Sequence, residues 1–539
     1  MKKIFNWKTA LILVILLASF LRLWQLGNIP AGTPNDEASY IYNSYSIWHT
    51  GRDILGNFLP LSFNAHSSQS PVEVYLTAPF VGLLGLSLFS ARLPAALLGI
   101  GSVFLIFLIT DLLFKNKRLS VISAFLLSIS PWALQINRGL WDSDFALFFF
   151  MLGIFVFIKY VNSKKFLWSI FPFLLAFYSY HGFKVFYVFL IPLLIFLYRK
   201  ELIVRKRQLG VFIAAFILTI ASFLFVMQTQ SITRQSQVNL LSDPKAVVAV
   251  NWEREFNNAP LKIQALFSNK ALYFLTVVRE NYLEAFSTNF LFLYGDTDQG
   301  SLIDNVYFRG ELYIIEFPLL LLGAYFLLKS KDERTRNLLL SLLFISPLPS
   351  TFTIDKNFVF RDVTMLPVLL IIVALGFNYL LDKIYTYKKF VRFSLLTIFA
   401  LVYVFLFSSY FYQYYYRWSV YGAEGWQKSY RDLVSIVDSK TNYKVYVSGQ
   451  QKEFLVQYAI FDQKDPAVIQ KVWNNDVIKI DNLTLMSGCI NGSDLSLVLP
   501  NKSIYAWQNG ACNYKNTPTQ KLYDSKDILT PIWDIYEKN

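Results

Sequence analysis

Long apolar runs recur along most of this chain, and they constrain its fold more than any other feature. A helix needs about 20 mostly apolar residues to cross the hydrocarbon core of a bilayer. The 539 residues are 55% hydrophobic and 16% charged, whereas an average soluble domain carries about 25% charged residues. A soluble chain could not bury this much apolar surface. The sequence therefore predicts a polytopic α-helical membrane protein, and it excludes an ordinary soluble enzyme, a disordered chain and a fibrous repeat.

About eleven of these runs are predicted to span the bilayer. They are residues 9–26, 91–114, 119–136, 145–161, 166–180, 185–198, 209–227, 312–328, 337–347, 363–381 and 393–411. The first run follows several lysines and could be a signal peptide. Because no small-residue cleavage site ends it, we interpret it as an uncleaved span. The fifth and sixth runs are short, and they could also form one kinked region.

The segments between the runs alternate between two kinds, and this alternation predicts the topology. One kind is short and basic, and the other is longer and carries most of the carboxylates. The basic segments are 115–118, 164–165, 199–207, 329–336 and 383–392. Because Lys and Arg concentrate in cytoplasmic loops, the N-terminus is predicted to be cytoplasmic, and loops 27–90 and 228–310 to face outward. The net charge of +14 is thus explained by topology, and no nucleic-acid-binding signature accompanies it.

The apolar run 72–88 tests this topology, because it is long enough to span. Counting it would place the basic segment 115–118 outside and invert every later loop. The run contains or adjoins Pro71, Pro79, Gly82 and Gly85. Prolines and glycines favour a broken element, so a juxtamembrane or re-entrant helix at the outer surface is predicted.

The tail differs from the transmembrane module at residues 1–411. Residues 412–539 are polar, with period-two stretches at 444–448 and 453–458 and a helical pattern at 429–438. This pattern predicts a small extracytoplasmic α+β domain. Both cysteines of the chain, Cys489 and Cys512, lie in it. An oxidising location favours a disulfide between them, and two buried free thiols are the alternative.

The sharpest chemical feature is the pair Asp36 and Glu37, which follows the first span. Charges beside lipid are expensive unless they are paired or solvated. A carboxylate at this position can act as a general base on a hydroxyl group. The alternative is structural, because acidic residues in a first helical turn stabilise a helix that begins near residue 36.

Further charged residues gather at the outer ends of the predicted spans. They are Arg92, Arg138, Asp142, Asp144, His181, Lys184, Asp355, Lys356, Arg361 and Asp362. Singly, each is explained as an interfacial side chain that reaches out of the bilayer. Together they suit a phosphate presented from the outer leaflet, because Arg and Lys bind phosphate through charge-assisted hydrogen bonds. No nucleotide-binding glycine motif and no zinc-like histidine pair is present, so neither cofactor nor metal is predicted.

Several stretches together resemble a known family in their order and loop placement. They are Asp36-Glu37, Ser90 to Gly99, Ser130-Pro131-Trp132, Asn137-Arg138, Asp142 to Asp144, Tyr178 to Tyr180, and Pro347 to Thr353 with Arg361. Over residues of about 1–410 the chain resembles the GT-C type membrane glycosyltransferases of the protein O-mannosyltransferase and aminoarabinose (lipid A) transferase family, which is glycosyltransferase family 39-like.

This resemblance implies a GT-C fold, a polyprenyl-phosphate-linked sugar donor and inversion at the anomeric carbon. Asp36 matches the family's catalytic acidic residue, Glu37 its neighbour, and Arg92 a functionally important arginine. One departure concerns the end of the first loop, where the family often has Lys-Pro-Pro or His-Pro-Pro. This chain has His66-Ser-Ser-Gln-Ser-Pro71 there, so a phosphate-contacting lysine is missing, and Lys184 or His66 would have to substitute.

The sequence thus predicts a multi-pass plasma-membrane glycosyltransferase. The resemblance implies a metal-independent site, and a divalent metal that bridges a carboxylate and the phosphate is the alternative. Asp36 is the predicted base and Glu37 its orienting neighbour, while Asp142, Asp144 and His181 support the site. The predicted ligands of the donor phosphate are Arg92, Arg138, Lys184 and Arg361. The acceptor could be a protein, a lipid or a glycan. A lipid-linked sugar transporter or flippase is the main alternative, but it needs a polar path through the spans that the sequence does not offer. A non-catalytic scaffold would leave Asp36 and Glu37 unexplained.

Overall fold

The computed structural model describes residues 6–63, 69–229, 240–296, 303, 306, 309–354 and 356–539. It divides into two compact units, and each is described by itself. Unit 1 comprises Met1–Arg22, Ala95–Asn137 and Trp141–Tyr410. Unit 2 comprises Leu23–Pro94, Arg138–Leu140 and Phe411–Asn539.

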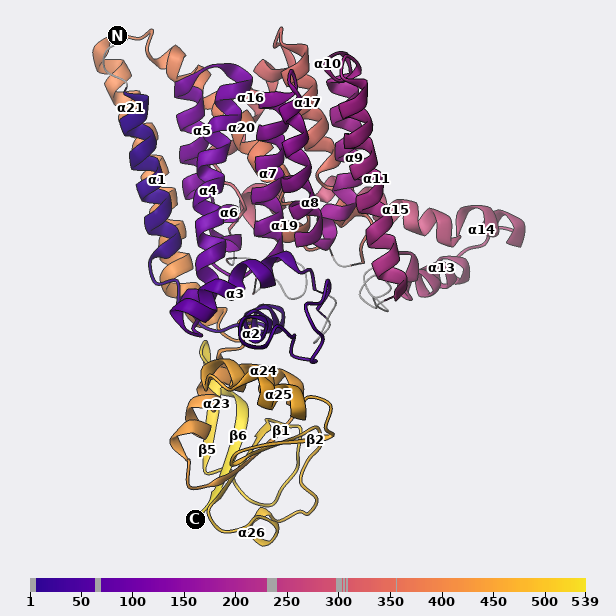
Figure 1. The fold of residues 1–539 in the computed structure, drawn as a ribbon, viewed down its shortest axis with the longest axis vertical. Helices are drawn as coiled ribbons and strands as arrows, with labels where there is room; N and C mark the ends of the chain where they lie inside the picture. The colour runs from indigo at the N-terminus through magenta and orange to yellow at the C-terminus, as the bar shows by residue number, and fades with distance from the viewer. Residues whose placement is uncertain are drawn as a thin grey trace. The chain divides into compact units, whose positions relative to one another are not determined.

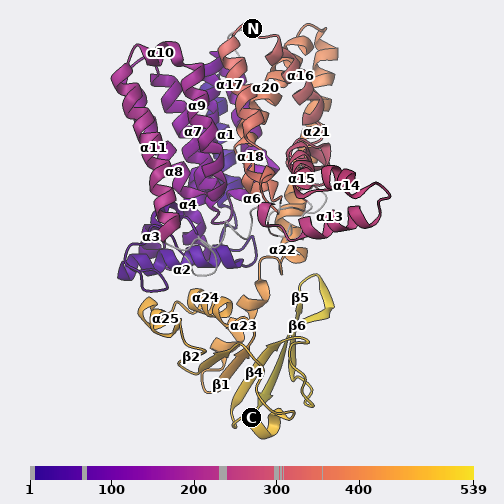
Figure 2. The same ribbon diagram turned by 90° about the vertical axis from the view of Figure 1, so that its right-hand side faces the viewer.

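Most helices of unit 1 run side by side as a bundle (Figures 1 and 2). Its longer helices are α1 (Trp7–Leu23), α4 (Leu88–Phe114), α5 (Lys117–Ile129), α7 (Asp142–Tyr160), α8 (Ile170–Ser179), α9 (His181–Leu197), α11 (Lys206–Thr229), α13 (Lys245–Glu255), α15 (Lys270–Glu284), α16 (Glu316–Leu328), α17 (Glu333–Ile345), α20 (Met365–Ile384) and α21 (Lys389–Tyr412). Shorter helices are α6 (Pro131–Ile136), α10 (Arg199–Ile203), α14 (Leu261–Phe267), α18 (Leu348–Thr351) and α19 (Phe358–Arg361).

Within the described residues, five helical stretches are long and apolar enough to cross a membrane. They are Leu88–Phe114, Asp142–Tyr160, Lys206–Phe225, Met365–Ile384 and Lys389–Tyr421. The prediction of a polytopic α-helical membrane protein is therefore confirmed. The number of spans, predicted as about eleven, stays a prediction.

One predicted span differs from the helices of the structure, and for another region the structure decides between two alternatives. Residues 119–136 form two helices, α5 and α6, separated at Ser130. The following Pro131 lacks an N–H group and disfavours a helical conformation at Ser130 (φ −58°, ψ 128°), whose hydroxyl instead accepts a hydrogen bond from the Ala133 N–H (3.3 Å). The region 166–198 forms two helices, α8 and α9, on either side of an extended Tyr180, instead of one kinked element.

Unit 2 begins with the first long loop, which contains the helices α2 (Asn35–Thr50) and α3 (Val72–Leu84). Helix α3 contains Pro79 and ends before Gly85, whose φ is +83°. With only 13 residues, α3 is too short to cross a bilayer. This length fits the predicted broken helical element, and its position at the outer surface stays a prediction.

The rest of unit 2 is the C-terminal region, which contains a mixed six-stranded sheet. The strands are β1 (Lys444–Ser448), β2 (Val477–Ile480), β3 (Leu483–Met486), β4 (Ser503–Gln508), β5 (Gln520–Asp524) and β6 (Asp527–Lys538), in the order β2-β3-β1-β4-β6-β5. Strand β1 is parallel to β3 and β4, and the other pairs are antiparallel. The helices are α22 (Trp418–Tyr421), α23 (Lys428–Ser439), α24 (Gln451–Phe461), α25 (Pro466–Val472) and α26 (Leu495–Val498).

Most of the secondary structure predicted for this region is confirmed, with one error. Strand β1 and helix α23 lie where the sequence predicts a strand and a helix. Residues 453–458, predicted as a strand, form part of helix α24 instead. Residues 454–460 are all buried, so this part of the helix has no solvent-exposed polar face. The sequence therefore lacks the 3.6-residue alternation of polar and apolar residues that predicts a helix. A disulfide joins Cys489 to Cys512, with 5.8 Å between their Cα atoms.

Candidate active site

The structure pairs Glu37 with Arg92 inside unit 2. The two carboxylate oxygens of Glu37 accept hydrogen bonds from Nε and Nη2 of Arg92, each at 2.7 Å. Both side chains are 0% exposed. The Leu140 N–H also donates to Glu37 Oε1 (2.9 Å). A bidentate, buried pair of this kind has a fixed geometry, because moving either charge would leave the other uncompensated.

Arg92 has no donor left for any other ligand. A guanidinium group has five N–H donors, and two of them bind Glu37. The other three donate to the carbonyl oxygens of Leu26 (3.4 Å), Pro30 (3.0 Å) and Gly32 (2.6 Å). Arg92 therefore ties the start of the first loop to the Glu37 carboxylate.

Asp36 lies beside this locked pair, in the first turn of α2. Helix α2 begins at Asn35. Asp36 and Glu37 therefore lie at a helix N-terminus, as the structural alternative predicts. Asp36 is half-buried while Glu37 is fully buried. The Asp36 carbonyl oxygen accepts a hydrogen bond from Gln69 Nε2 (3.1 Å). This bond fixes the Asp36 carbonyl group, and the Asp36 side chain is the more accessible of the two.

Arg138 belongs to the same unit and also binds the first loop. Its Nη2 donates to the carbonyl oxygens of Trp24 (2.8 Å) and Ile29 (3.0 Å). The guanidinium carbon lies 5.7 Å from the ring centre of Tyr414 and 4.8 Å from that of Tyr415. Cation–π contacts at these distances stabilise a buried guanidinium.

Asp144 belongs to a buried polar network in unit 1 that the sequence analysis missed in part. Asn137 donates to Asp144 Oδ1 and accepts a hydrogen bond from Arg22 Nε (2.9 Å). Arg22 also donates to the carbonyl oxygens of Ser128 (3.1 Å) and Leu127 (3.3 Å). The sequence did contain a signal, since Arg22 is the one ionisable residue in the apolar run 9–26 and such residues usually have a function or a partner.

Three further predicted site residues of unit 1 lie in the first turns of helices. Asp142 and His181 are half-buried at the first positions of α7 and α9. Lys184 is buried, with its ammonium 5.1 Å from the ring centre of Phe223. Of the residues named from sequence, His66 and Asp355 lie outside the described part of the chain.

Arg361 and Asp362 lie just before helix α20. Arg361 Nη1 donates to Thr353 Oγ1 (2.8 Å) and to the Lys356 carbonyl oxygen (3.3 Å). Asp362 is buried and accepts a hydrogen bond from the Ser350 hydroxyl (2.8 Å). Burial raises the pKa of the Asp362 carboxyl well above its usual range, against the lowering effects of the Ser350 bond and the Arg361 charge.

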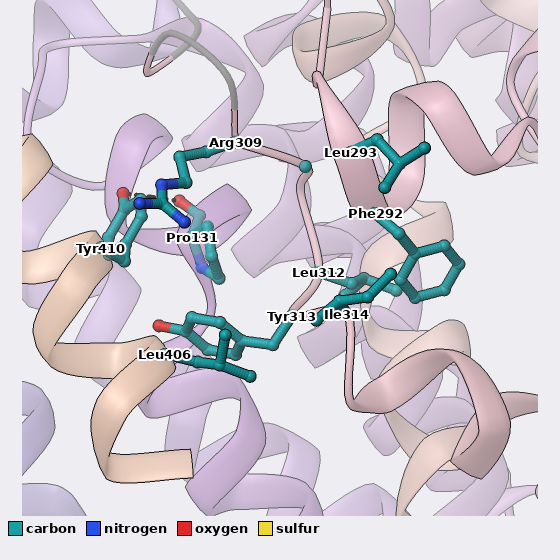
Figure 3. Close-up of a pocket in the computed structure, with 10 residues that line it drawn as sticks. Pro131, Phe292, Leu293, Arg309, Leu312, Tyr313, Ile314, Leu406 and Tyr410 are labelled. Atoms are coloured by element: carbon teal, nitrogen blue, oxygen red, sulfur yellow. Dashed lines mark hydrogen bonds between the residues drawn. The ribbon is translucent and has the colours of Figure 1, made fainter. Parts of the chain in front are cut away.

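Unit 1 also contains a cavity of about 120 Å³ (Figure 3). It is lined by Pro131, Phe292, Leu293, Arg309, Gly310, Leu312, Tyr313, Ile314, Leu406 and Tyr410. Arg309 also donates to the Ser409 hydroxyl (2.6 Å), and the Tyr410 hydroxyl donates to the Pro131 carbonyl oxygen (3.2 Å). Apolar walls with one guanidinium suit an anion that carries an apolar group. Arg309 was not among the site residues predicted from the sequence.

Within the described residues, no three His, Cys, Asp or Glu side chains lie close enough together to hold a metal ion. The predicted site residues are divided between the units. Asp36, Glu37, Arg92 and Arg138 belong to unit 2, and Asp142, Asp144, His181, Lys184 and Arg361 belong to unit 1. That they act together on one donor phosphate stays a prediction.

The chain is similar to known membrane glycosyltransferases. Residues 68–226 match the family model described as dolichyl-phosphate-mannose-protein mannosyltransferase. ArnT from Cupriavidus metallidurans, solved with bound undecaprenyl phosphate, superposes with a TM-score of 0.52 at 11% identity, over 98% of each chain. The Archaeoglobus fulgidus oligosaccharyltransferase gives a TM-score of 0.49 at 13% identity and covers 86% of this chain. This chain spans 64% of that protein's length. No curated protein sequence matches the chain.

These matches confirm two predictions. The family model, which matches residues 68–226, confirms the resemblance to the protein O-mannosyltransferases. The ArnT superposition over the full chain shows the same fold.

Proposed function

We propose that this protein transfers a sugar from a polyprenyl-phosphate-linked donor to an acceptor hydroxyl, with inversion at the anomeric carbon. The observation that carries the proposal is the half-buried Asp36 beside the locked pair of Glu37 and Arg92. Fixed neighbours position the backbone that carries this carboxylate, and base catalysis requires such positioning. The family model, whose description names a lipid-phosphate sugar donor, supports the same donor class.

The proposed reaction is a single displacement. The acceptor oxygen attacks the anomeric carbon while its proton passes to Asp36, and the bond from that carbon to the phosphate oxygen breaks. The lipid phosphate leaves as a stable anion, so no general acid is needed. Positive charge must instead stabilise the leaving phosphate.

The structure changes our proposal for Arg92. All five of its donors are bound within the protein, so we assign Arg92 to positioning Glu37 and the first loop instead of binding phosphate. Arg138, Lys184 and Arg361 remain the candidate phosphate ligands, and Arg309 joins them because its cavity suits an amphiphilic anion. Asp142, Asp144 and His181 keep their proposed supporting role.

Replacing Arg138 by Ala is expected to raise the donor KM about 10-fold or more, because a charge-assisted bond contributes about 1.5–3 kcal/mol. The acceptor KM should change less than about twofold. Steady-state kinetics with each substrate varied in turn checks this. An unchanged donor KM would show that Arg138 serves only to hold the carbonyl groups of Trp24 and Ile29.

We place the site and residues 412–539 on the outer face of the plasma membrane and the N-terminus in the cytoplasm, with about eleven spans. The disulfide between Cys489 and Cys512 supports an oxidising location for the C-terminal region. Reporter fusions at residue 36 and at the C-terminus should both report the outer side. Opposite locations for these two positions would contradict the proposed topology.

The decisive experiment uses purified protein in lipid nanodiscs with a radiolabelled polyprenyl-phosphate sugar and candidate protein, lipid and glycan acceptors. We expect label to move from the donor to one acceptor, at a rate that EDTA does not change. In proteoliposomes, movement of intact donor across the bilayer without sugar transfer would favour the alternative, a lipid-linked sugar flippase.

A further inference from the structure

The segment 31–35 leads directly into Asp36, and the C-terminal region of unit 2 binds it at several points. Arg431 Nη1 donates to the Ala31 carbonyl oxygen (3.3 Å). Gln457 Nε2 donates to the Thr33 carbonyl oxygen (2.6 Å). Both bonds join residues about 400 positions apart in the sequence, so folding of the C-terminal region fixes the backbone of the first loop.

Gly32 and Asn35 make further contacts with the same region. A Cβ atom on Gly32 would lie 2.0 Å from the Trp426 carbonyl oxygen, so this close approach requires glycine. The Asn35 side chain lies near Glu453 in the first turn of α24. Its proximity lowers the pKa of the Glu453 carboxyl, although burial raises it more.

Gln457 is the most buried of these contacts. Its side chain is 1% exposed, and Nε2 also donates to Gln427 Oε1 (3.0 Å). Both N–H groups of its amide are therefore used. A hydrogen bond away from water is stronger than one at a surface, and leaving its acceptor unpaired is more costly. Gln457 thus fixes the Thr33 carbonyl group, three residues before Asp36.

We infer that the C-terminal region is a positioning element of the transferase site, and that helix α24 acts on Asp36 through Gln457. This inference rests on the proposed role of Asp36 as the base. A misplacement of about 1 Å at a reacting group lowers the rate by about 100-fold, so loosening the segment 31–35 slows the chemical step. Donor binding depends on the cationic side chains and changes little.

The test is the variant Gln457→Leu, which keeps the approximate volume but removes both donors. Its kcat should fall about 10-fold or more, while the donor KM stays within about twofold. Hydrogen–deuterium exchange should speed up in residues 31–37. The exchange measurement needs no activity, so it reports on the positioning even if the donor assay shows no transfer by the wild type.

Gln470→Leu is the matched control. Gln470 lies in helix α25, and its Nε2 donates to the hydroxyl groups of Ser46 (3.1 Å) and Thr50 (3.2 Å) and to the Asp53 carbonyl oxygen (3.0 Å). Ser46 and Thr50 lie at the far end of helix α2, and Asp53 follows it. The control therefore removes three bonds between the same two regions, whereas Gln457→Leu removes one. Because these bonds lie away from Asp36, the kcat of the control should still stay within about twofold of the wild type.

Three results decide the matter. A lower kcat and faster exchange in Gln457→Leu alone supports the inference. An equal fall of kcat in both variants overturns it, because the contact would then serve only the stability of unit 2. The inference is also overturned if residues 31–37 of Gln457→Leu exchange hydrogen for deuterium at the wild-type rate. Absence of transfer by the wild type itself would refute the proposed function, and the exchange result would then stand separately.

Discussion

Replacing Asp36 by Asn is expected to lower kcat by about 10²–10⁴-fold, the usual contribution of a general base. The amide has nearly the same shape as the carboxylate, but it cannot accept the proton of the acceptor hydroxyl. Because Asp36 is half-buried in the first turn of α2, loss of its charge should lower helix stability by only about 0.3–1 kcal/mol. The measurement is sugar transfer from a radiolabelled donor, together with thermal unfolding of both proteins.

Asp111→Asn is the matched control for this variant. Asp111 is the carboxylate partner of Lys117 (2.7 Å) near the end of helix α4, and both side chains are partly exposed. An exposed ion pair contributes about 0–1 kcal/mol, so transfer should stay within about twofold of the wild type. A wild-type rate for Asp36→Asn would leave Asp36 only its structural role at the start of α2.

The sequence predicts features whose causes are local. The charge pattern places Asp36 and Glu37 at the start of a helix, and α2 does begin at Asn35. Residues 444–448 form a strand because their period-two pattern is matched by burial on one side of a sheet. The apolar runs predict membrane helices because the hydrophobic requirement of the bilayer leaves few alternatives.

Partners distant in the sequence could not be predicted. The chain contains 50 Lys and Arg residues, and nothing local selects Arg92 as the partner of Glu37. The same holds for Gln457 and Thr33, which meet only after the first loop and the C-terminal region have folded together. Helix α24 was mistaken for a strand for a related reason, since burial on all sides removes the polar face that reveals a helix.

A second large effect is expected for the buried pair itself. Glu37→Gln would leave the charge of Arg92 without compensation in a site where both side chains are 0% exposed. Breaking such a pair typically destabilises a protein by about 3–5 kcal/mol. Denaturant unfolding of the purified protein in detergent should detect this loss. Transfer should fall as well, because Glu37 adjoins Asp36 in the same helical turn.

A double-mutant cycle measures the interaction between Glu37 and Arg92 apart from their contacts with other residues. Arg92→Met alone should also be strongly destabilising, because it leaves the Glu37 charge without its cationic partner and three carbonyl groups without a donor. Glu37→Gln combined with Arg92→Met removes both charges, so its loss of stability should be at least about 1 kcal/mol smaller than the sum of the single losses. The carbonyl groups stay unpaired, so stability does not return to that of the wild type. Additive losses would mean that the two charges do not stabilise each other, and Glu37 would then be held chiefly by the Leu140 N–H.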